Sequence, residues 1–154
     1  MTEAKQKIMF DTNAFDKLLN VLDVFRSNAN NFDFYITAIQ VEELAKINDI
    51  KCETRIKNFL ALCELRAILV PTSFVFDHTR LGFACFSDSS DNTYELLLNE
   101  NKSDVNDALI GETAKREKCT LITDDTKFIK KLCKVDIPTM TFQEFYEKIL
   151  QQSN

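Results

Sequence analysis

Short apolar runs alternate with segments whose apolar residues have helical spacing, and this alternation is the feature that most constrains the fold. The apolar runs span residues 8–10, 34–36, 67–70, 120–123 and 135–140. Runs of this length are typical of strands, whereas the segments between most of them are long enough for helices. Strands that alternate with helices form parallel sheets with helices on both faces. The sequence therefore predicts an α/β fold with a central parallel sheet.

Helix start signals support this interpretation. Residues 37–40 and 141–144 have the form of capping boxes, which begin helices. Residues 104–118 carry acidic residues at the start and basic residues at the end, an arrangement that interacts favourably with the dipole of a helix. Further helices are expected over residues 15–25, over residues 56–63 and after residue 127. Residues 72–103 show no clear pattern apart from a short helix near residues 96–98.

The composition indicates one globular domain over residues 1–154. Hydrophobic residues make up 45% and charged residues 28% of the chain, an ordinary balance for a domain with its own core. The first seven residues are polar and charged, unlike a secretory signal. No apolar run approaches the roughly 20 residues that span a bilayer. We therefore expect a cytoplasmic protein without membrane association.

Cysteine and histidine usage excludes several kinds of site. The five cysteines are widely spaced and form no C-x-x-C pair, so we expect free thiols and no zinc site. His78 is the only histidine, and no partner motif for Ser-His-Asp or Cys-His catalysis lies near it. We interpret His78 as a loop residue near a turn.

Carboxylates stand where a parallel sheet binds its ligands. Asp11 directly follows the first apolar run, and the Asp124-Asp125 pair follows the run at 120–123. Ligands of open parallel sheets bind beyond the carboxyl ends of the strands. If these two strands are neighbours, the carboxylates of Asp11 and Asp125 converge on one edge. Glu43 and Asp107 lie on predicted helices.

Convergent carboxylates point to a divalent cation. Acids in a small volume raise one another's pKa unless cations neutralise them, and Mg²⁺ or Mn²⁺ prefers carboxylate oxygen and water as ligands. Such metals hydrolyse phosphodiesters without a histidine base. Taken singly, each acid is equally compatible with a structural role, Asp11 as a helix cap, Asp107 as a partner of the helix dipole and Glu43 as an exposed acid.

Three stretches resemble the motifs of the PIN-domain family. Residues 10–13 (FDTN) match an opening motif in which an apolar strand ends in Asp. Residues 37–44 (TAIQVEEL) resemble a second motif, in which Ser or Thr begins a helix that carries a Glu-Leu pair. Residues 107–114 (DALIGETA) and 121–128 (LITDDTKF) are similar to the C-terminal signature of D-A-L-I, a helix and T-x-D-x-x-F. This last match is the most specific.

The resemblance implies a three-layer α/β/α sandwich that cleaves RNA with Mg²⁺ or Mn²⁺. It maps an acidic quartet, which is both catalytic and metal-binding, onto Asp11, Glu43, Asp107 and Asp125. Many small bacterial and archaeal members are VapC-like toxins, which dimerise and are inhibited by an antitoxin. An RNA substrate, an antitoxin partner and a homodimer are therefore expected. Residues 72–103 depart from the family in being longer and rich in phenylalanine.

Other polar residues near these motifs are assigned supporting roles. Thr12, Asn13 and Thr123 are expected to orient the carboxylates by hydrogen bonds, as ligands of metals usually require. Asp104 is predicted to be a helix cap or an outer acid of the site. Asp124 is predicted to stand behind the primary ligands or to add one.

The net charge of −5 argues against a broad surface for nucleic acid but not against a local one. Basic residues follow the motifs that carry Glu43, Asp107 and Asp125, so some should clamp RNA phosphates beside the acids. The candidates are Lys51, Arg55, Arg116 and Lys127. The alternative is that these side chains merely solvate helix faces or contact an antitoxin.

Three other functional classes were weighed against the nuclease. A phosphatase of the haloacid-dehalogenase kind also has Asp after its first strand, but it needs a second Asp where this chain has Asn13. A response-regulator receiver carries its paired acids near the start of the chain, not near the end. A catalytically idle PIN-like module could bind RNA or protein with the same fold. The presence of all four acids favours the nuclease.

Overall fold

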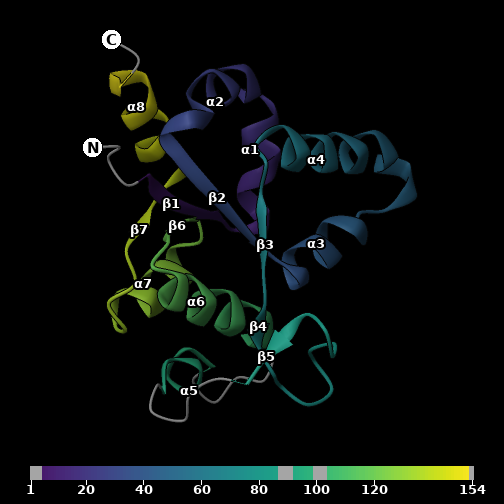
Figure 1. Ribbon diagram of the computed structural model, residues 1–154, viewed down its shortest axis with the longest axis vertical. Coiled ribbons are helices and arrows are strands. Elements are labelled where there is room, and N and C mark those ends of the chain that lie inside the picture. Colours follow the sequence, from purple (N-terminus) through teal and green to yellow (C-terminus); the bar gives the residue numbers. More distant parts are fainter. Residues whose placement is uncertain (1–4, 87–91, 99–103, 153–154) are drawn as a thin grey trace.

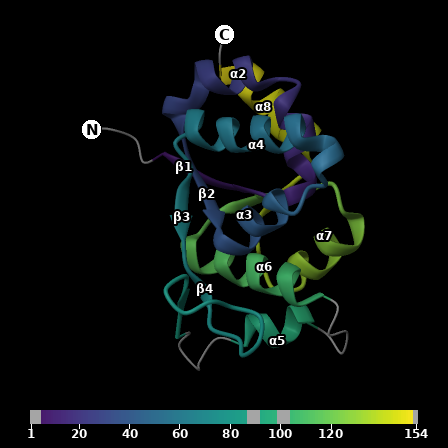
Figure 2. The ribbon, with the colours of Figure 1, turned by 90° about the vertical axis from the view of Figure 1, so that its right-hand side faces the viewer.

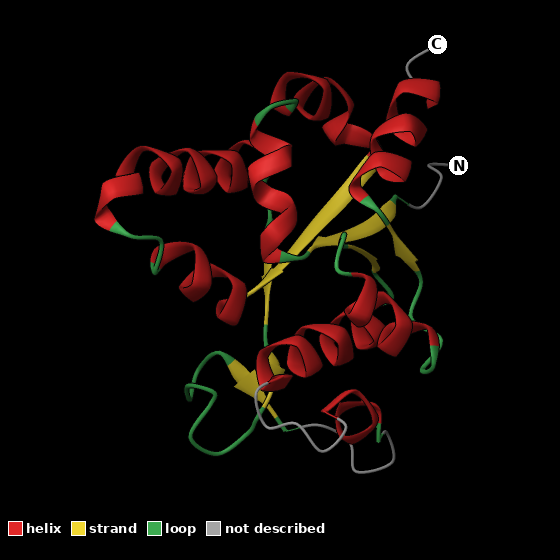
Figure 3. Ribbon diagram, turned by 180° about the vertical axis from the view of Figure 1, so that it is seen from behind, coloured by secondary structure: helices red, strands yellow, loops and turns green. Residues whose placement is uncertain are grey.

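A five-stranded parallel sheet forms the centre of the molecule. The computed structural model describes residues 5–86, 92–98 and 104–152. The strand order is β3-β2-β1-β6-β7, and all four neighbouring pairs are parallel, as predicted. The strands of this sheet, visible in Figures 1 and 3, are β1 (Gln6–Phe10), β2 (Phe32–Thr37), β3 (Ile68–Val70), β6 (Thr120–Ile122) and β7 (Thr139–Met140).

Helices cover both faces of the sheet, which gives the predicted three-layer sandwich. Figure 2 shows α2 and α8 above the strands and α5, α6 and α7 below them. The α-helices are α1 (Phe15–Leu19), α2 (Leu22–Asn28), α3 (Ala38–Ala45), α4 (Cys52–Glu64), α5 (Thr93–Leu98), α6 (Val105–Glu117), α7 (Thr126–Cys133) and α8 (Phe142–Gln152). Short 3₁₀ helices are η1 (Thr12–Ala14), η2 (Ala29–Asn31) and η3 (Asp49–Lys51).

Two separate apolar cores hold the layers together, because successive strand residues point to opposite faces. In the core beneath α1, α2 and α8, the centroid of the Phe10 ring lies 5.7 to 6.0 Å from the ring centroids of four other phenylalanines. Met9 enters the other core, against α6 and α7. Gly111 allows α6 to pack closely there, since a Cβ atom would lie 2.7 Å from a methyl of Leu97.

Both predicted capping boxes are present. Thr37 Oγ1 accepts a hydrogen bond from the backbone of Gln40, whose side chain accepts one from the backbone of Thr37. Thr141 and Glu144 exchange the same pair of bonds at the start of α8. These local bonds fix where α3 and α8 begin, and the start of α3 is close to the candidate site.

Three predicted elements differ in the structure. The helix expected over residues 15–25 is split at Asn20 and Val21 into α1 and α2. The last strand is only Thr139–Met140, shorter than the apolar run at 135–140. Helix α4 buries Asn58 and Ala61, whereas Ile56 and Leu60 of its expected apolar face are half exposed. The buried positions of α4 are therefore small or polar, while Leu62 packs partly buried against the core.

Residues 72–86 form an excursion from the sheet, which we call the β4–β5 excursion. Strands β4 (Thr72–Ser73) and β5 (Ala84–Cys85) pair in parallel and form a separate two-stranded sheet. The loop between them reaches out beside α3 in Figure 1. The short helix expected near residues 96–98 is α5, while residues 87–91 and 99–103 of the uncertain stretch lie outside the described residues.

Two predictions about cysteines and membranes can be compared with the structure. All five cysteines are free, as expected from their spacing. Within the described ranges, each helix is too short or too polar to cross a membrane.

Candidate functional site

Asp11 lies buried at the carboxyl edge of the sheet, between the ends of β1 and β6. The two strands pair directly, with Phe10 opposite Ile122, and Asp11 N–H donates to the carbonyl of Ile122 at 2.8 Å. Thr123 follows β6 and its hydroxyl donates to Asp11 Oδ2 at 2.8 Å. Only 6% of Asp11 is exposed. The prediction that the strands before Asp11 and Asp125 are neighbours is therefore confirmed.

Helix α3 brings Glu43 to the same edge. Gln40 is fully buried and its side-chain amide donates to the carbonyl of Phe10 at 2.6 Å, which ties the first turn of α3 to the end of β1. Glu43 lies one turn further along, on the same helix face. Its two carboxylate oxygens accept hydrogen bonds from Thr12 Oγ1 at 2.5 Å and Asn106 Nδ2 at 2.8 Å. Glu43 is thus held between η1 and α6.

Asp107 shows that the acids share one electrostatic environment. Burial, and after it the charges of Asp11, Asp104, Glu43 and Asp125, together raise the pKa of its carboxyl to about 6. Burial also raises the pKa of Asp11, although hydrogen bonds from Thr123 and the Thr12 backbone oppose this effect. Glu43 and Asp125 act on Asp11 as well. The four predicted acids therefore form a mutually repelling cluster.

Asp125 has a structural role that the sequence analysis did not predict. Its Oδ1 caps α7 by accepting hydrogen bonds from the backbone N–H groups of Lys127, at 2.8 Å, and Phe128, at 3.1 Å. Its own N–H donates to Thr123 Oγ1 at 3.2 Å, so Thr123 connects Asp125 to Asp11. Capping leaves Oδ2 of Asp125 open to a further partner.

The donor set of this cluster is compatible with a hard divalent cation. No three acidic, cysteine or histidine side chains of the described residues lie close enough together to enclose a metal ion. The cluster is therefore not a ready-made cage. Mg²⁺ usually keeps several waters and binds through one or two carboxylates and substrate phosphates, and the all-oxygen cluster fits that mode. Asp11, Glu43, Asp107 and Asp125 are the residues that would hold the ion.

Comparison with known proteins identifies the family. The family model of the PIN domain matches residues 8–134, which is most of the chain. This chain belongs to the PIN-domain family. The match also decides against the phosphatase and receiver alternatives. No curated protein sequence matches the chain significantly.

Solved structures show the same fold at low sequence identity. PAE2754 from Pyrobaculum aerophilum superimposes with a TM-score of 0.61 and 10% identity, over 96% of this chain and 99% of that one. VapBC2 from Rickettsia felis, bound to a DNA fragment from its promoter, superimposes with a TM-score of 0.53 and 18% identity. That alignment covers 88% of this chain and 98% of the other. At these identities the similarity concerns the fold alone.

Of the residues predicted to support the acids of the PIN domain, some contact these acids and others do not. Thr12 and Thr123 contact Glu43 and Asp11, as expected. Asn13 is exposed and makes no side-chain hydrogen bond within the described part of the chain. Asp104 precedes α6 without a capping hydrogen bond and pairs with Lys131, while its charge helps to raise the pKa of Asp107.

Asp124 faces away from the cluster rather than standing behind it. One of its oxygens binds Lys17 Nζ at 2.7 Å, and the other accepts a hydrogen bond from the N–H of Phe142 at 3.1 Å. Asp124 therefore links α1 to the start of α8. The neighbouring Asp125, by contrast, contributes its charge to the site.

Gln40 and Asn106 are the two site residues that the sequence analysis missed. Gln40 was visible only as the last residue of a capping box, and nothing local indicated that its amide would reach β1. Asn106 stands beside Asp107 in the first turn of α6, where a polar residue is ordinary. Both contacts join elements that are distant in sequence, so only the fold reveals them.

Two of the four predicted phosphate-binding cations are engaged inside the protein. Arg116 donates to the carbonyl of Pro71 and lies 3.7 Å from the buried carboxylate of Glu112. Arg55 donates to the carbonyl of Ile47 and to Asp49, both at 3.1 Å. These bonds give both residues a structural role, and their contact with RNA stays a prediction. Lys51 and Lys127 are exposed.

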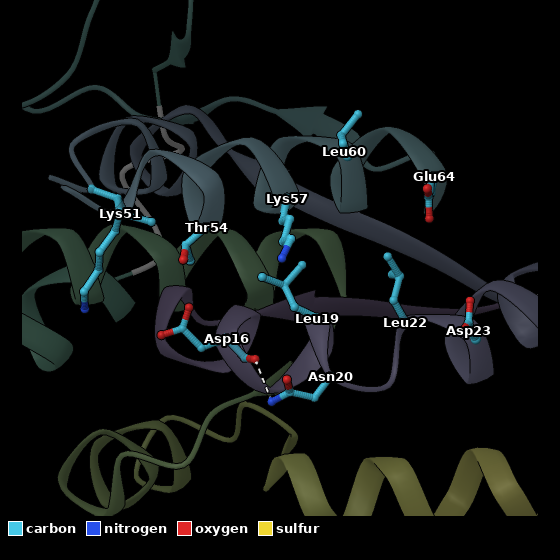
Figure 4. Close-up of a pocket in the computed structure, with 11 residues that line it drawn as sticks. Asp16, Leu19, Asn20, Leu22, Asp23, Lys51, Thr54, Lys57, Leu60 and Glu64 are labelled. Atoms are coloured by element: carbon cyan, nitrogen blue, oxygen red, sulfur yellow. Dashed lines mark hydrogen bonds between the residues drawn. The ribbon is translucent and has the colours of Figure 1, made fainter. Parts of the chain in front are cut away.

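Two grooves run along the surface near α3 and α4. One, of about 740 Å³, lies between α1, α2 and α4 and includes Lys51 but none of the four acids. Figure 4 shows Lys51 at one end of this groove and Asp23 and Glu64 at the other. The second, of about 900 Å³, lies between α3, the start of α6 and the β4–β5 excursion. Because it is lined by Glu43 and Asn106, the second groove opens onto the acidic cluster.

Proposed function

We propose that this PIN domain is a ribonuclease that uses Mg²⁺ or Mn²⁺, held by Asp11, Glu43, Asp107 and Asp125. PIN domains are generally nucleases and typically use divalent cations. The observation that carries the proposal for this chain is the gathering of these acids at the carboxyl edge of the sheet, where burial and the neighbouring charges raise the pKa of Asp107 to about 6. A divalent cation at this edge would offset the mutual repulsion of the carboxylates at neutral pH.

The protein contributes orientation to this chemistry. A bound divalent ion supplies a water of lowered pKa and stabilises charge on the phosphate and leaving oxygen. Thr123 and the Thr12 backbone hold Asp11, while Thr12 Oγ1 and Asn106 hold Glu43. Such hydrogen bonds orient carboxylates that would otherwise rotate away from an ion. The single histidine has no part in this account.

The proposal also includes the molecules that this protein binds. VapBC2 from Rickettsia felis carries a toxin–antitoxin name. We therefore infer that this chain is a cytoplasmic toxin-type PIN domain with an RNA substrate and an antitoxin partner, and that it forms a homodimer. Co-expression with the product of a neighbouring small gene, followed by size exclusion with light scattering, measures both the complex and the dimer.

The decisive experiment compares cleavage of an unstructured RNA by the wild type and by Asp11→Asn. We expect cleavage in Mg²⁺ or Mn²⁺, none in EDTA, and recovery when metal is restored. Asp11→Asn should be inactive while keeping its melting temperature in EDTA within a few degrees. Asp16→Asn, an exposed carboxylate of α1 outside the cluster, is the matched control and should remain active. An idle PIN-like module would leave the RNA intact under every condition.

A further inference from the structure

The groove beside Glu43 is lined by aromatic and basic residues that are not part of the acidic cluster. Its volume is about 900 Å³, and its walls are α3, the start of α6 and the loop after β4. Glu43 and Asn106 form the end nearest the cluster. Phe74 and Phe76 line it from the β4–β5 excursion. An occupant of this groove would therefore touch both aromatic rings and the functional edge.

Phe76 is the most exposed aromatic ring that lines the groove. It is 78% exposed, whereas its neighbour Phe74 is partly buried and packs at 5.7 Å from the ring of Phe86. A large apolar ring in water is unfavourable unless a ligand covers it. Phe76 is thus the ring that presents a free face to an occupant.

The loop that carries Phe76 is held by defined contacts. The N–H of Val75 donates to Thr79 Oγ1 at 2.9 Å, and the N–H of Thr79 donates back to the carbonyl of Val75 at 3.0 Å. Arg80 Nε lies 3.0 Å from Glu42 Oε1, which fastens the loop to α3 across the groove. These contacts keep Phe76 in the wall and lower the entropy that a ligand would otherwise have to offset.

The charges around the groove favour a ligand with both flat faces and phosphates. Lys46 lies one turn after Glu43 and is exposed, and Arg80 adds a second cation. Glu42 and Asp77 offset part of this charge, so electrostatic attraction alone would be weak. Proteins that bind single-stranded nucleic acid combine aromatic stacking platforms with cations that contact the backbone.

We propose that this groove binds an unpaired base of the RNA strand, stacked on Phe76, with an adjacent phosphate on Lys46. The inference rests on the proposed ribonuclease function and deepens it. The stacked base lies beside the nucleotide whose phosphate is cut at the edge of the acidic cluster. The enzyme thereby selects RNA whose bases are unpaired next to the cut, because a duplex cannot offer a free base face.

Binding of uncleaved strands tests this inference separately from catalysis. Asp11→Asn protein is titrated with an unstructured RNA of eight nucleotides and with a ribose-phosphate strand of equal length without bases. The wild-type groove should favour the RNA, and Phe76→Leu should reduce this preference by about 5- to 150-fold, the range for one base stacked on an aromatic ring. Phe83→Leu makes the same change on a half-exposed ring that does not line this groove and should leave the preference unchanged.

Lys46→Ala provides the second arm of the test. It should weaken both strands equally and reduce the salt dependence of binding, because it removes a phosphate contact and no base contact. An unchanged preference in Phe76→Leu overturns the inference and leaves the groove to a protein partner. Failure of RNA cleavage together with a preference that depends on Phe76 would instead refute the ribonuclease function and support the base site.

Discussion

The acidic cluster and the β4–β5 excursion lie on two sides of one groove, yet the chain specifies them differently. The cluster is built from short motifs, each fixed by a buried contact, such as Thr123 with Asp11 and Gln40 with the end of β1. The excursion carries exposed rings and is held by a few loop contacts and a two-residue strand pair. The difference indicates that buried contacts with the sheet fix the position of the acids, whereas the excursion depends on a few contacts within and beside its own loop.

The largest effect expected from a residue that does not itself bind metal is that of Asn106. Its amide fixes one oxygen of Glu43, so Asn106→Ala should lower cleavage by about 10- to 100-fold and raise the Mn²⁺ concentration needed for half-maximal rate. Steady-state rates across a Mn²⁺ series measure both. Asn106→Asp would add repulsion to the cluster and should be worse. If Asn106→Ala retained the wild-type rate and Mn²⁺ requirement, the orientation of Glu43 would not matter.

Arg116 distinguishes a structural cation from an RNA-binding one. Arg116→Ala removes the neighbour of the buried Glu112 carboxylate and a donor to Pro71, so the free energy of unfolding should fall by about 1–3 kcal/mol. Urea denaturation measures this change. RNA affinity per folded molecule should stay constant. A loss of affinity with unchanged stability would restore Arg116 to the phosphate clamp.

Asp107 gives the cluster a characteristic pH dependence. Its pKa is about 6 in the folded chain against an ordinary value of 3.8, so between these values the folded protein binds a proton that the unfolded chain does not. The stability contributed by this group is complete below the lower value and is lost as pH rises through about 6. Without metal, the melting temperature should therefore fall between about pH 4 and about pH 7, and less so in Asp107→Asn.

The same experiment connects the pKa with the cation. Saturating Mg²⁺ should raise the melting temperature of the wild type at neutral pH, because an ion that binds only the folded state stabilises it. Asp107→Asn should gain little from Mg²⁺. An identical pH profile in the wild type and in Asp107→Asn would show that folding does not raise the pKa of Asp107.

The smallest effect is expected at the two exposed lysines. Lys127→Ala and Lys51→Ala should each reduce the slope of log affinity against log salt by about 0.7 for single-stranded RNA, if each contacts one phosphate. Lys127 follows the Asp125 cap, whereas Lys51 lies in the groove of Figure 4 away from the acids. A change at Lys127 alone would place the strand near α7. If neither substitution changed this slope, both lysines would point into solvent without contacting the RNA.

The sheet, its helices and the convergence of the acids could be predicted because each depends on local signals. Asp11 and Asp125 follow apolar strands, and a capping box begins the helix of Glu43. Strand adjacency then brings these residues to one edge. Local sequence patterns were sufficient to predict those strands and helices that bury one face.

Residues whose roles depend on distant partners could not be predicted. Asp124 looked like part of the site but binds Lys17 and the start of α8. Arg116 looked like a surface cation, since nothing near it in sequence indicates the carbonyl of Pro71. The groove beside Glu43 was missed for the same reason, because it forms only when the β4–β5 excursion folds back beside α3.

Titration of Mn²⁺ while cleavage of one unstructured RNA is followed tests the central claim most directly. The wild type should show saturable activation by Mn²⁺, and free Mn²⁺ measured by electron paramagnetic resonance should reveal at least one bound ion over the same range. Asp107→Asn should lose both the bound ion and more than about 100-fold of the rate, beyond the loss typical of a residue that only orients a ligand. Full activity in EDTA, or Mn²⁺ binding unchanged in Asp107→Asn, would contradict the account.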